Sequence, residues 1–278
     1  TFIYKKSCSI FREKLMKKIG IIGAGISGLF IANLFKGNSN YQITVFEKNH
    51  AIDLDEGYGI QLSVNSVKLL NQIGFDKFKD DKKFNPDKIN FYSIKKSNKI
   101  CDLDISEFNS QECKYTTLKR SDLVNFLKMG LENSIKTNHS ISKIEQKNKE
   151  IRLIFENNEI FECDFLIISD GVFSKSKGLM SNNETQPIFN KTLAIRGTIP
   201  SSQKIDCKNI SLFLGPNFHQ VIYPVNSGGD LNFIAILKYN LSISDQKNYS
   251  LFNDDNFIKK ILDDIPSDMR EFLNEIKQ

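Results

Sequence analysis

The sequence predicts an α/β fold in which a strand–helix–strand part is followed by an antiparallel sheet. The first observation is an apolar run at Ile19–Ile22 that leads through a glycine-rich turn into a helical segment. The second is a change of pattern after Ile188, where several segments alternate apolar and polar residues, as strands with one covered face do. With 278 residues, 40% of them hydrophobic, the chain is long enough for one large α/β domain or two smaller ones.

The glycine-rich turn carries three glycines, Gly23, Gly25 and Gly28, and an acidic residue, Glu47, ends the next apolar run, Ile43–Phe46. This combination is the fingerprint of a Rossmann-like domain that binds a dinucleotide. The first glycine permits the tight turn, the second lets the backbone approach a pyrophosphate, and the third lets the helix pack on the strand. Free N–H groups at the helix start would face the phosphates, and Glu47 would accept the ribose hydroxyls. The alternative is a strand–helix junction without a ligand, and the pattern does not distinguish FAD from NAD.

Charge, cysteine content and hydropathy argue against several classes of protein. The net charge of +5 is spread among alternating basic and acidic residues, which indicates a solvated surface rather than a nucleic-acid or membrane interface. Five cysteines without Cys-x-x-Cys spacing indicate neither a disulfide framework nor a metal site and fit the reducing cytoplasm. The apolar segment Ile19–Phe35 is shorter than the ~20 residues of a membrane span. Residues 1–15 lack the apolar core of a signal peptide, and we expect them to be an extension outside the fold.

The remaining segments alternate between helical and extended patterns. A continuous apolar run at Asp164–Ser169 is typical of a strand buried in a parallel sheet. Strands that interrupt the Rossmann-like part argue against a plain NAD dehydrogenase, which would continue as strand, helix, strand and helix. We expect a loop at 55–62, a helix at 64–73, paired strands at 88–94 and 99–103, a helix at 120–133, a meander at 139–145, 151–156 and 159–162, strands at 192–198, 210–214, 218–225 and 231–237, and helices at 246–263 and 267–277.

Three further motifs point to one family. The segment Gly59–Asn65 resembles a Gly-Ile-x-Leu-x-Pro-Asn loop, with Val64 where Pro is usual and Tyr58 where Ala is usual. Lys119–Leu123 resembles an Arg-x-x-Leu helix start, and the segment after Ser169 resembles an Asp-Gly motif. The chain thus resembles the FAD-dependent aromatic hydroxylases related to p-hydroxybenzoate hydroxylase. It is most similar to the branch of salicylate hydroxylase, 3-hydroxybenzoate 6-hydroxylase and 6-hydroxynicotinate 3-monooxygenase.

The resemblance implies which residues contact the cofactors. Two positions have plain alternatives: Arg120 could be a surface charge beside a Ser121 N-cap, and Asp170-Gly171 could be an ordinary turn. The Asp-Gly motif would also contact NAD(P)H, and Ile141 would lie near the adenine through its backbone. The implied FAD-binding residues are Gly23, Gly25, Gly28, Glu47, Lys48, Gln61, Arg120, Ile141, Asp170 and Gly171.

In the antiparallel part, related hydroxylases place a His and a Tyr four residues apart, and this chain has His219 and Tyr223. On a strand the two share one face with Val221. Their Cα atoms would lie ~13 Å apart at ~3.3 Å per residue, so they would bracket a small ring rather than touch. A histidine can take a phenol proton near neutral pH. The alternative is a half-buried His and Tyr whose polar atoms are satisfied by the backbone.

We therefore expect an FAD- and NAD(P)H-dependent monooxygenase that hydroxylates a small aromatic compound. By resemblance, NAD(P)H reduces the flavin, O₂ adds at flavin C4a, and the resulting hydroperoxide passes a hydroxyl group to the ring. Residues 16–180 would form the FAD-binding domain, with 85–115 contributing strands toward the substrate side, and 181–278 the substrate domain. We expect no nucleic-acid partner, no transmembrane segment and no metal, with a homodimer as the candidate assembly.

One family motif is missing from the sequence. A second FAD-binding Gly-Asp pair, followed by Ala-His, normally comes after the substrate sheet. Gly229-Asp230 is followed by Leu231-Asn232 and lies in a turn between predicted strands. We therefore expect a fragment. Two alternatives stay open: a ubiquinone-pathway ring hydroxylase and a truncated, non-catalytic flavoprotein. Flavin halogenases carry a Trp-containing motif, and this chain has no Trp.

Overall fold

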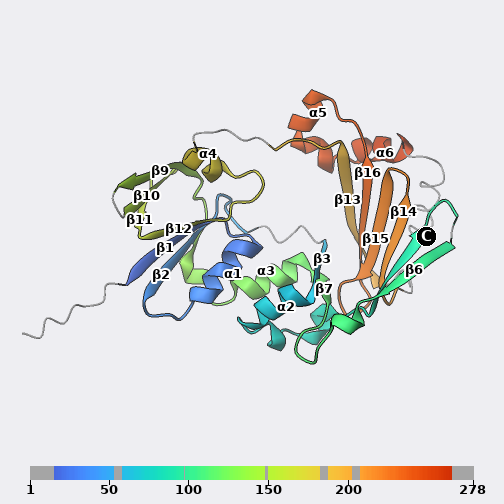
Figure 1. The fold of residues 1–278 in the computed structure, drawn as a ribbon. Helices are drawn as coiled ribbons and strands as arrows, with labels where there is room; N and C mark the ends of the chain where they lie inside the picture. Colours follow the sequence, from blue (N-terminus) through green and yellow to red (C-terminus); the bar gives the residue numbers. More distant parts are fainter. Residues whose placement is uncertain are drawn as a thin grey trace, which may run out of the picture. The chain divides into compact units, whose positions relative to one another are not determined.

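The computed structural model describes residues 16–52, 58–96, 98–147, 150–181, 187–201 and 207–264. By its contacts the chain divides into two units, residues 1–52 with 127–186 and residues 53–126 with 187–278. Each unit is therefore assembled from two separate stretches of chain (Figure 1). The domain boundaries expected from the sequence, 16–180 and 181–278, stay a prediction.

The first unit contains a parallel sheet built on the predicted strand–helix–strand element. Strand β1 (Lys17–Ile22) leads into helix α1 (Ile26–Phe35) and strand β2 (Tyr41–Phe46). The sheet order is β12-β1-β2-β8, with β8 at Ile135–Lys136 and β12 at Phe165–Ile168, and every pairing in it is parallel. The apolar side chains of β1 and β2 supply much of its core, which confirms the Rossmann-like element.

The same unit carries the predicted antiparallel meander. Its strands are β9 (Ile141–Lys147), β10 (Glu150–Phe155) and β11 (Ile160–Cys163), in the order β11-β10-β9. The short helix α4 (Lys175–Ser181) comes after β12 in the chain. Phe46 of β2 packs on Phe155 with ring centroids 4.6 Å apart. Burial of such aromatic and aliphatic side chains holds the meander against the parallel sheet.

Strand β12 lies in the parallel sheet, as predicted, and pairs with β1, but it is not buried. The side chains of Phe165 and Ile168 are 52% and 38% exposed. Within the described part of the chain β12 is the last strand of its sheet, so only one of its edges is paired. The apolar run predicted the parallel pairing, but it could not reveal that the strand stands at an edge.

The second unit is dominated by a six-stranded sheet in the order β13-β16-β15-β14-β5-β6 (Figure 1). All neighbours are antiparallel except β14 and β5, a parallel pair that the sequence pattern does not predict. Phe257 and Ile261 of α6 pack against Phe218 and Leu237, and so cover one face. The strands are β5 (Lys88–Ser93), β6 (Asn98–Asp104), β13 (Thr192–Ile199), β14 (Ile210–Gly215), β15 (Phe218–Pro224) and β16 (Leu231–Lys238).

A small three-stranded sheet, β3-β7-β4, completes the second unit. The sequence suggested a loop over 55–62, but Gly59–Leu62 is a strand because it finds a partner in β7, far along the chain. The expected helix at 246–263 is broken into α5, a 3₁₀ turn and α6, and the one at 120–133 ends at Lys128. The expected helix at 267–277 lies outside the described residues.

The strands of the small sheet are β3 (Gly59–Leu62), β4 (Lys83–Phe84) and β7 (Thr116–Lys119). The helices not yet given are α2 (Val64–Asn71), α3 (Arg120–Lys128), α5 (Ile243–Lys247) and α6 (Asp255–Asp264), and the residue range of α3 includes the division between the two units. The 3₁₀ turns are Phe75–Lys77, Asp80–Lys82, Ser106–Phe108, Glu132–Ser134 and Tyr249–Asn253, of which Glu132–Ser134 belongs to the first unit.

None of the helices in the described part of the chain has the length and hydropathy that a membrane span requires.

Candidate functional site

The glycine turn after β1 shows why three glycines are needed. Gly23 has a φ of +100°, and a Cβ there would lie 2.5 Å from the carbonyl oxygen of Ser169. A Cβ at Gly28 would collide with the carbonyl oxygen of Gly23, because α1 packs directly on the turn. A Cβ at Gly25 would meet no atom within 4 Å. Gly23 and Gly28 therefore serve internal packing, whereas Gly25 leaves open space over the backbone.

The start of α1 can receive an anion. Its N-cap is Gly25, which has no side chain to accept the free N–H groups of the helix start, and the first turn holds no acidic residue. Glu47 lies at the turn, where its Oε2 accepts the Ala24 N–H at 3.1 Å and its Oε1 accepts the Asn49 N–H at 3.0 Å. Uncapped N–H groups and a positive dipole end are the elements of a phosphate site. The acidic side chain beside them is placed to accept hydroxyl groups.

A pocket of about 320 Å³, here called the fingerprint pocket, opens beside this turn in the first unit. It is lined by five of the residues that the resemblance implies for FAD: Gly23, Glu47, Lys48, Ile141 and Asp170. They come from the ends of β1 and β2, the start of β9 and the segment after β12. The pocket thus combines an acidic acceptor, apolar surface and a basic side chain next to an uncapped helix start. This combination fits the adenosine and diphosphate part of FAD.

Asp170 also has a structural task. Its Oδ1 accepts the Ser174 hydroxyl at 2.6 Å and its Oδ2 accepts the Ser176 N–H at 3.1 Å. Gly171 follows in the left-handed region with a φ of +81°. The carboxylate therefore organises the turn that starts α4, as the ordinary-turn alternative requires. Contact of Asp170-Gly171 with a cofactor stays a prediction.

His139 lines the same pocket and was not singled out in the sequence. Its side chain is almost wholly buried, between the rings of Phe46 and Phe155. Nδ1 lies 2.5 Å from the Thr137 carbonyl oxygen and Nε2 lies 3.0 Å from Oε2 of Glu159. The hydrogen bond from His139, with help from Lys136, lowers the pKa of Glu159. A lone histidine outside any motif carries no signal of such a position.

In the second unit, the buried residues Tyr223 and Asn232 lie with the half-buried Gln61 and Tyr115 in a group of polar side chains, here called the Tyr223 cluster. Tyr223 is 1% exposed, and burial raises its pKa to about 12, although the nearby amides of Gln61 and Asn232 and the charge of Arg196 oppose the shift. Gln61 accepts the Tyr115 hydroxyl at 2.8 Å, and Oδ1 of Asn232 accepts the Gly59 N–H at 2.5 Å. The Tyr223 hydroxyl is therefore held in its protonated, hydrogen-bonding form.

Arg120 and Arg196 both approach the ring of Tyr58. The guanidinium carbons lie 5.8 Å and 4.6 Å from the ring centroid, distances at which a cation and an aromatic face attract. The backbone N–H of Arg120 also donates to the Tyr58 carbonyl oxygen at 2.9 Å. Tyr58, an aromatic residue where alanine is usual in the resembled family, thus has two cations near its ring. The sequence pattern gave Arg196 no role of its own.

His219 lies on the same strand as Tyr223 but in different surroundings. It is partly buried in a pocket of about 250 Å³ at the β14–β15 hairpin, and its neighbours across the strands are Leu214 and Ile236. Tyr223 instead pairs with Asn232. The structure thus joins Tyr223 to Gln61 and sets His219 apart. In the described part of the chain, no group of three or more His, Cys, Asp or Glu residues is arranged to hold a metal.

No family model matches the chain, but curated proteins and solved structures do. The chain is 24% identical over 244 residues to a salicylate hydroxylase of Pseudomonas putida, and the alignment covers 81% of this chain and 56% of that protein. It is 25% identical over 225 residues to a 3-amino-4-hydroxybenzoate 2-monooxygenase of Streptomyces cremeus, covering 79% and 56%. The chain therefore spans little more than half the length of these curated relatives.

Solved structures share the fold. HpxO of Klebsiella pneumoniae complexed with FAD and uric acid matches with a TM-score of 0.72 at 17% identity, over 82% of this chain and 58% of that one. A salicylate hydroxylase substrate complex matches with a TM-score of 0.66 at 16% identity, over 82% and 57%. The chain shares the fold of these structures, and the resemblance to FAD-dependent aromatic hydroxylases inferred from the sequence is confirmed.

Proposed function

We propose that this chain is part of an FAD- and NAD(P)H-dependent monooxygenase that hydroxylates a small, hydroxylated aromatic compound. The observation that supports the proposal is the fingerprint pocket, which is lined by residues that the resemblance implies for FAD, from four separate segments beside an uncapped helix start. The relatives named as salicylate and aminohydroxybenzoate hydroxylases support the same class of reaction. The observed fold supports it as well.

In the first unit, the chain's task is to bind and orient the cofactor. The N–H groups after Gly25 would donate to the diphosphate, and Lys48 would add a positive charge. The Glu47 carboxylate would exchange its bond to the Ala24 N–H for the ribose hydroxyls. Ile141 would place its backbone beside the adenine. When bound, FAD supplies the redox chemistry with NAD(P)H and O₂, which no side chain here can provide.

In the second unit, the residues that we assign to the aromatic substrate are His219 and Tyr223. His219 would take or relay the phenol proton of the ring, which makes the ring more electron-rich. Tyr223 keeps its proton well above neutral pH, so it would act as an orienting hydrogen-bond partner and not as a base. Gln61 and Arg120 would adjoin the flavin. The apolar neighbours of His219 would help to keep water away from the reacting ring.

FAD titration of the purified chain, followed by quenching of flavin fluorescence, tests the cofactor proposal. We expect saturable binding that is weakened about tenfold or more by Glu47→Gln, because the variant loses charge-assisted hydrogen bonds to the ribose. Glu107→Gln removes an exposed carboxylate of the second unit and serves as the matched control. A chain that unfolds cooperatively yet shows no affinity for FAD would overturn the proposal.

A non-catalytic flavoprotein is the second candidate, because the chain spans about 56% of its curated relatives. NAD(P)H oxidation in the presence of FAD separates the two. Stimulation by small hydroxybenzoates, lost in His219→Ala while FAD binding is kept, supports the hydroxylase. FAD binding without any stimulated oxidation supports the non-catalytic protein. Stimulation only by polyprenylated phenols would indicate a ubiquinone-type substrate.

A further inference from the structure

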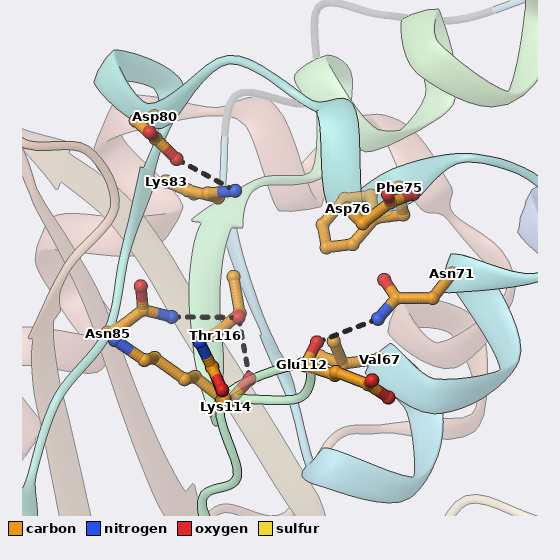
Figure 2. Close-up of a pocket in the computed structure, with 11 residues that line it drawn as sticks. Val67, Asn71, Phe75, Asp76, Asp80, Lys83, Asn85, Glu112, Lys114 and Thr116 are labelled. Atoms are coloured by element: carbon orange, nitrogen blue, oxygen red, sulfur yellow. Dashed lines mark hydrogen bonds and ion pairs between the residues drawn. The ribbon is translucent and has the colours of Figure 1, made fainter.

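Two regions of the second unit differ in how open their side chains are to a ligand. A cavity of about 500 Å³ lies beside α2 (Figure 2). Oδ1 of Asn71 is buried there and has no hydrogen-bond partner among the described residues. However, Val67 and Phe75 in its lining are only 5% and 2% exposed, and Lys83 already lies near the Phe75 ring. The six-stranded sheet offers more accessible side chains.

This sheet has one covered face and one open face. Phe218, Ala235 and Leu237 lie on the face that α6 covers, and each is at most 4% exposed. Because side chains alternate along a strand, the residues between them project from the opposite face. This opposite face, here called the open face, carries exposed or half-buried side chains that a ligand can reach. They are Arg196 of β13, Ile234 and Ile236 of β16, His219 and Val221 of β15, and Leu212 and Leu214 of β14.

The strand register places Arg196 at one end of an apolar row on the open face. Its neighbour in β16 is Ile234, and the row continues through Val221 of β15 and Leu212 of β14. At ~4.8 Å between strands, the Cα atoms of Arg196 and Val221 lie ~10 Å apart. His219 projects from the same face, two residues from Val221 along β15. An aromatic ring on Ile234 and Val221 would therefore have a cation at one end and an imidazole at its side.

The positive charge of Arg196 is available to such a ligand. Among the residues that the structure describes, no carboxylate pairs with Arg196, and its side chain is exposed. The guanidinium carbon lies 4.6 Å from the centroid of the Tyr58 ring. A guanidinium that lies over an aromatic face keeps the N–H groups at its edge for other partners. Those N–H groups can donate two parallel hydrogen bonds to a carboxylate.

Lys238 is the alternative cation on the open face. It is exposed at the end of β16 and lines the pocket that contains His219. Its ammonium group is a point charge on a flexible stem, whereas the guanidinium of Arg196 is a planar fork that the Tyr58 ring restrains. Arg196 also begins the apolar row. The geometry therefore favours Arg196 as the partner of a flat anion.

We propose that Arg196, held in place by the ring of Tyr58, selects aromatic substrates that carry a carboxylate. The edge of the guanidinium donates to the carboxylate, the ring packs on Ile234 and Val221, and a ring hydroxyl faces His219. Arg196 is then a specificity-determining residue, and Tyr58 is a positioning residue that acts through it. This inference rests on the proposed function, because it names the class of substrate for the same site.

Salicylate is the probe, with salicylamide as a neutral control of the same shape and 2-hydroxybenzylamine as a cationic control. We expect salicylate to shift the backbone amide NMR signals of Arg196, Val221 and Ile234 saturably. Salicylamide should bind at least about tenfold more weakly, because it lacks the charge-assisted hydrogen bonds, and the amine should leave the signals in place. Equal binding of salicylate and salicylamide, or no saturable shift with salicylate, would overturn the inference.

Variants of the two cations locate the carboxylate. Arg196→Gln removes the charge from an exposed side chain, and we expect at least about tenfold weaker binding of salicylate. Arg196→Lys keeps the charge but loses the fork, so it should bind about threefold more weakly. Lys238→Gln removes an exposed cation from the same face and is the matched control, which should bind as the unaltered chain does. A loss in Lys238→Gln as large as that in Arg196→Gln would show that the assignment is wrong.

The positioning role of Tyr58 has its own test. Tyr58→Phe keeps the ring and should keep the affinity for salicylate, whereas Tyr58→Leu should lose about threefold. In the Arg196→Gln background, Tyr58→Leu should cause no further loss, because the cation that the ring restrains is gone. The same threefold loss in that background would mean that Tyr58 does not act through Arg196.

FAD titration separates this inference from the proposed function. Salicylate binding that depends on Arg196, in a chain without affinity for FAD, would support the carboxylate site and overturn the flavin proposal. FAD binding by a chain whose affinity for salicylate is the same in Arg196→Gln would overturn the carboxylate site and leave the flavin proposal in place.

Discussion

The fingerprint pocket of the first unit and the Tyr223 cluster of the second unit are organised on different principles. The pocket is built around one short turn, in which Gly23 and Gly28 have no room for a side chain. The cluster gathers Gln61, Tyr115, Tyr223 and Asn232 from separate strands and loops. Tyr115 donates to Gln61, and Asn232 accepts the Gly59 N–H. Backbone packing stabilises the first, and buried polar pairing stabilises the second. The two should therefore fail in different ways when they are perturbed.

The largest effect is expected at the glycine turn. Gly28→Ala places a Cβ against the Gly23 carbonyl oxygen, and we expect the free energy of unfolding to fall by about 3 kcal/mol. Gly25→Ala is the matched control, because its Cβ meets open space and its φ of −77° suits alanine. The control should keep stability within ~0.5 kcal/mol. Urea unfolding measures both variants, and equal losses would show that packing does not set the turn.

The burial of Tyr223 should make the free energy of unfolding depend on pH in the alkaline range. Burial raises the pKa of Tyr223 to about 12 in the folded chain, above its ordinary value of 10.0. The unfolded chain therefore releases this proton first, so the stabilisation is complete below pH 10 and is lost as the pH rises toward 12. The slope approaches about 1.4 kcal/mol per pH unit. Urea unfolding at pH 9, 10 and 11 should show a shallower loss in Tyr223→Phe, and identical slopes would argue against a buried hydroxyl.

A smaller effect is expected from Asn232→Ala. The change removes the acceptor of the Gly59 N–H and leaves that buried donor unsatisfied. We expect about 2 kcal/mol lower stability of the second unit. Asn226→Ala, in the turn between β15 and β16, removes two less buried hydrogen bonds with Asp230 and should lose less. Thermal unfolding ranks the two variants, and the opposite order would contradict the importance of the cluster.

The smallest effect is expected from Ser169→Ala. The Ser169 hydroxyl donates to the carbonyl oxygens of Ile22 and Gly23, at 2.9 Å and 3.3 Å, and so supports the glycine turn from β12. We expect a loss of about 1 kcal/mol. The affinity for FAD should fall only slightly, because the turn keeps its glycines. A loss as large as that of Gly28→Ala would mean that hydrogen bonding, and not packing, fixes the turn.

Prediction from the sequence succeeded where the signal is local. The strand–helix–strand element, the meander and the four long strands of the second unit follow from apolar periodicity, and each was found close to its expected range. Prediction failed for strands whose formation or pairing depends on a partner far away in the chain. Gly59–Leu62 is a strand only because β7 pairs with it, and β5 joins β14 in parallel across more than a hundred residues. Periodicity within one segment carries no information about such partners.

The sequence by itself determined the glycine turn, its acidic companion and the type of fold, because spacing within a few residues dictates backbone shape. Only the tertiary structure decided which side chains meet: Tyr58 near two arginines, His139 in the fingerprint pocket, and Asn71 with a buried oxygen that lacks a donor. Those meetings depend on how strands far apart in the chain pair and pack. Burying a polar atom costs free energy unless the atom is hydrogen-bonded, and the sequence does not show which polar atoms are buried.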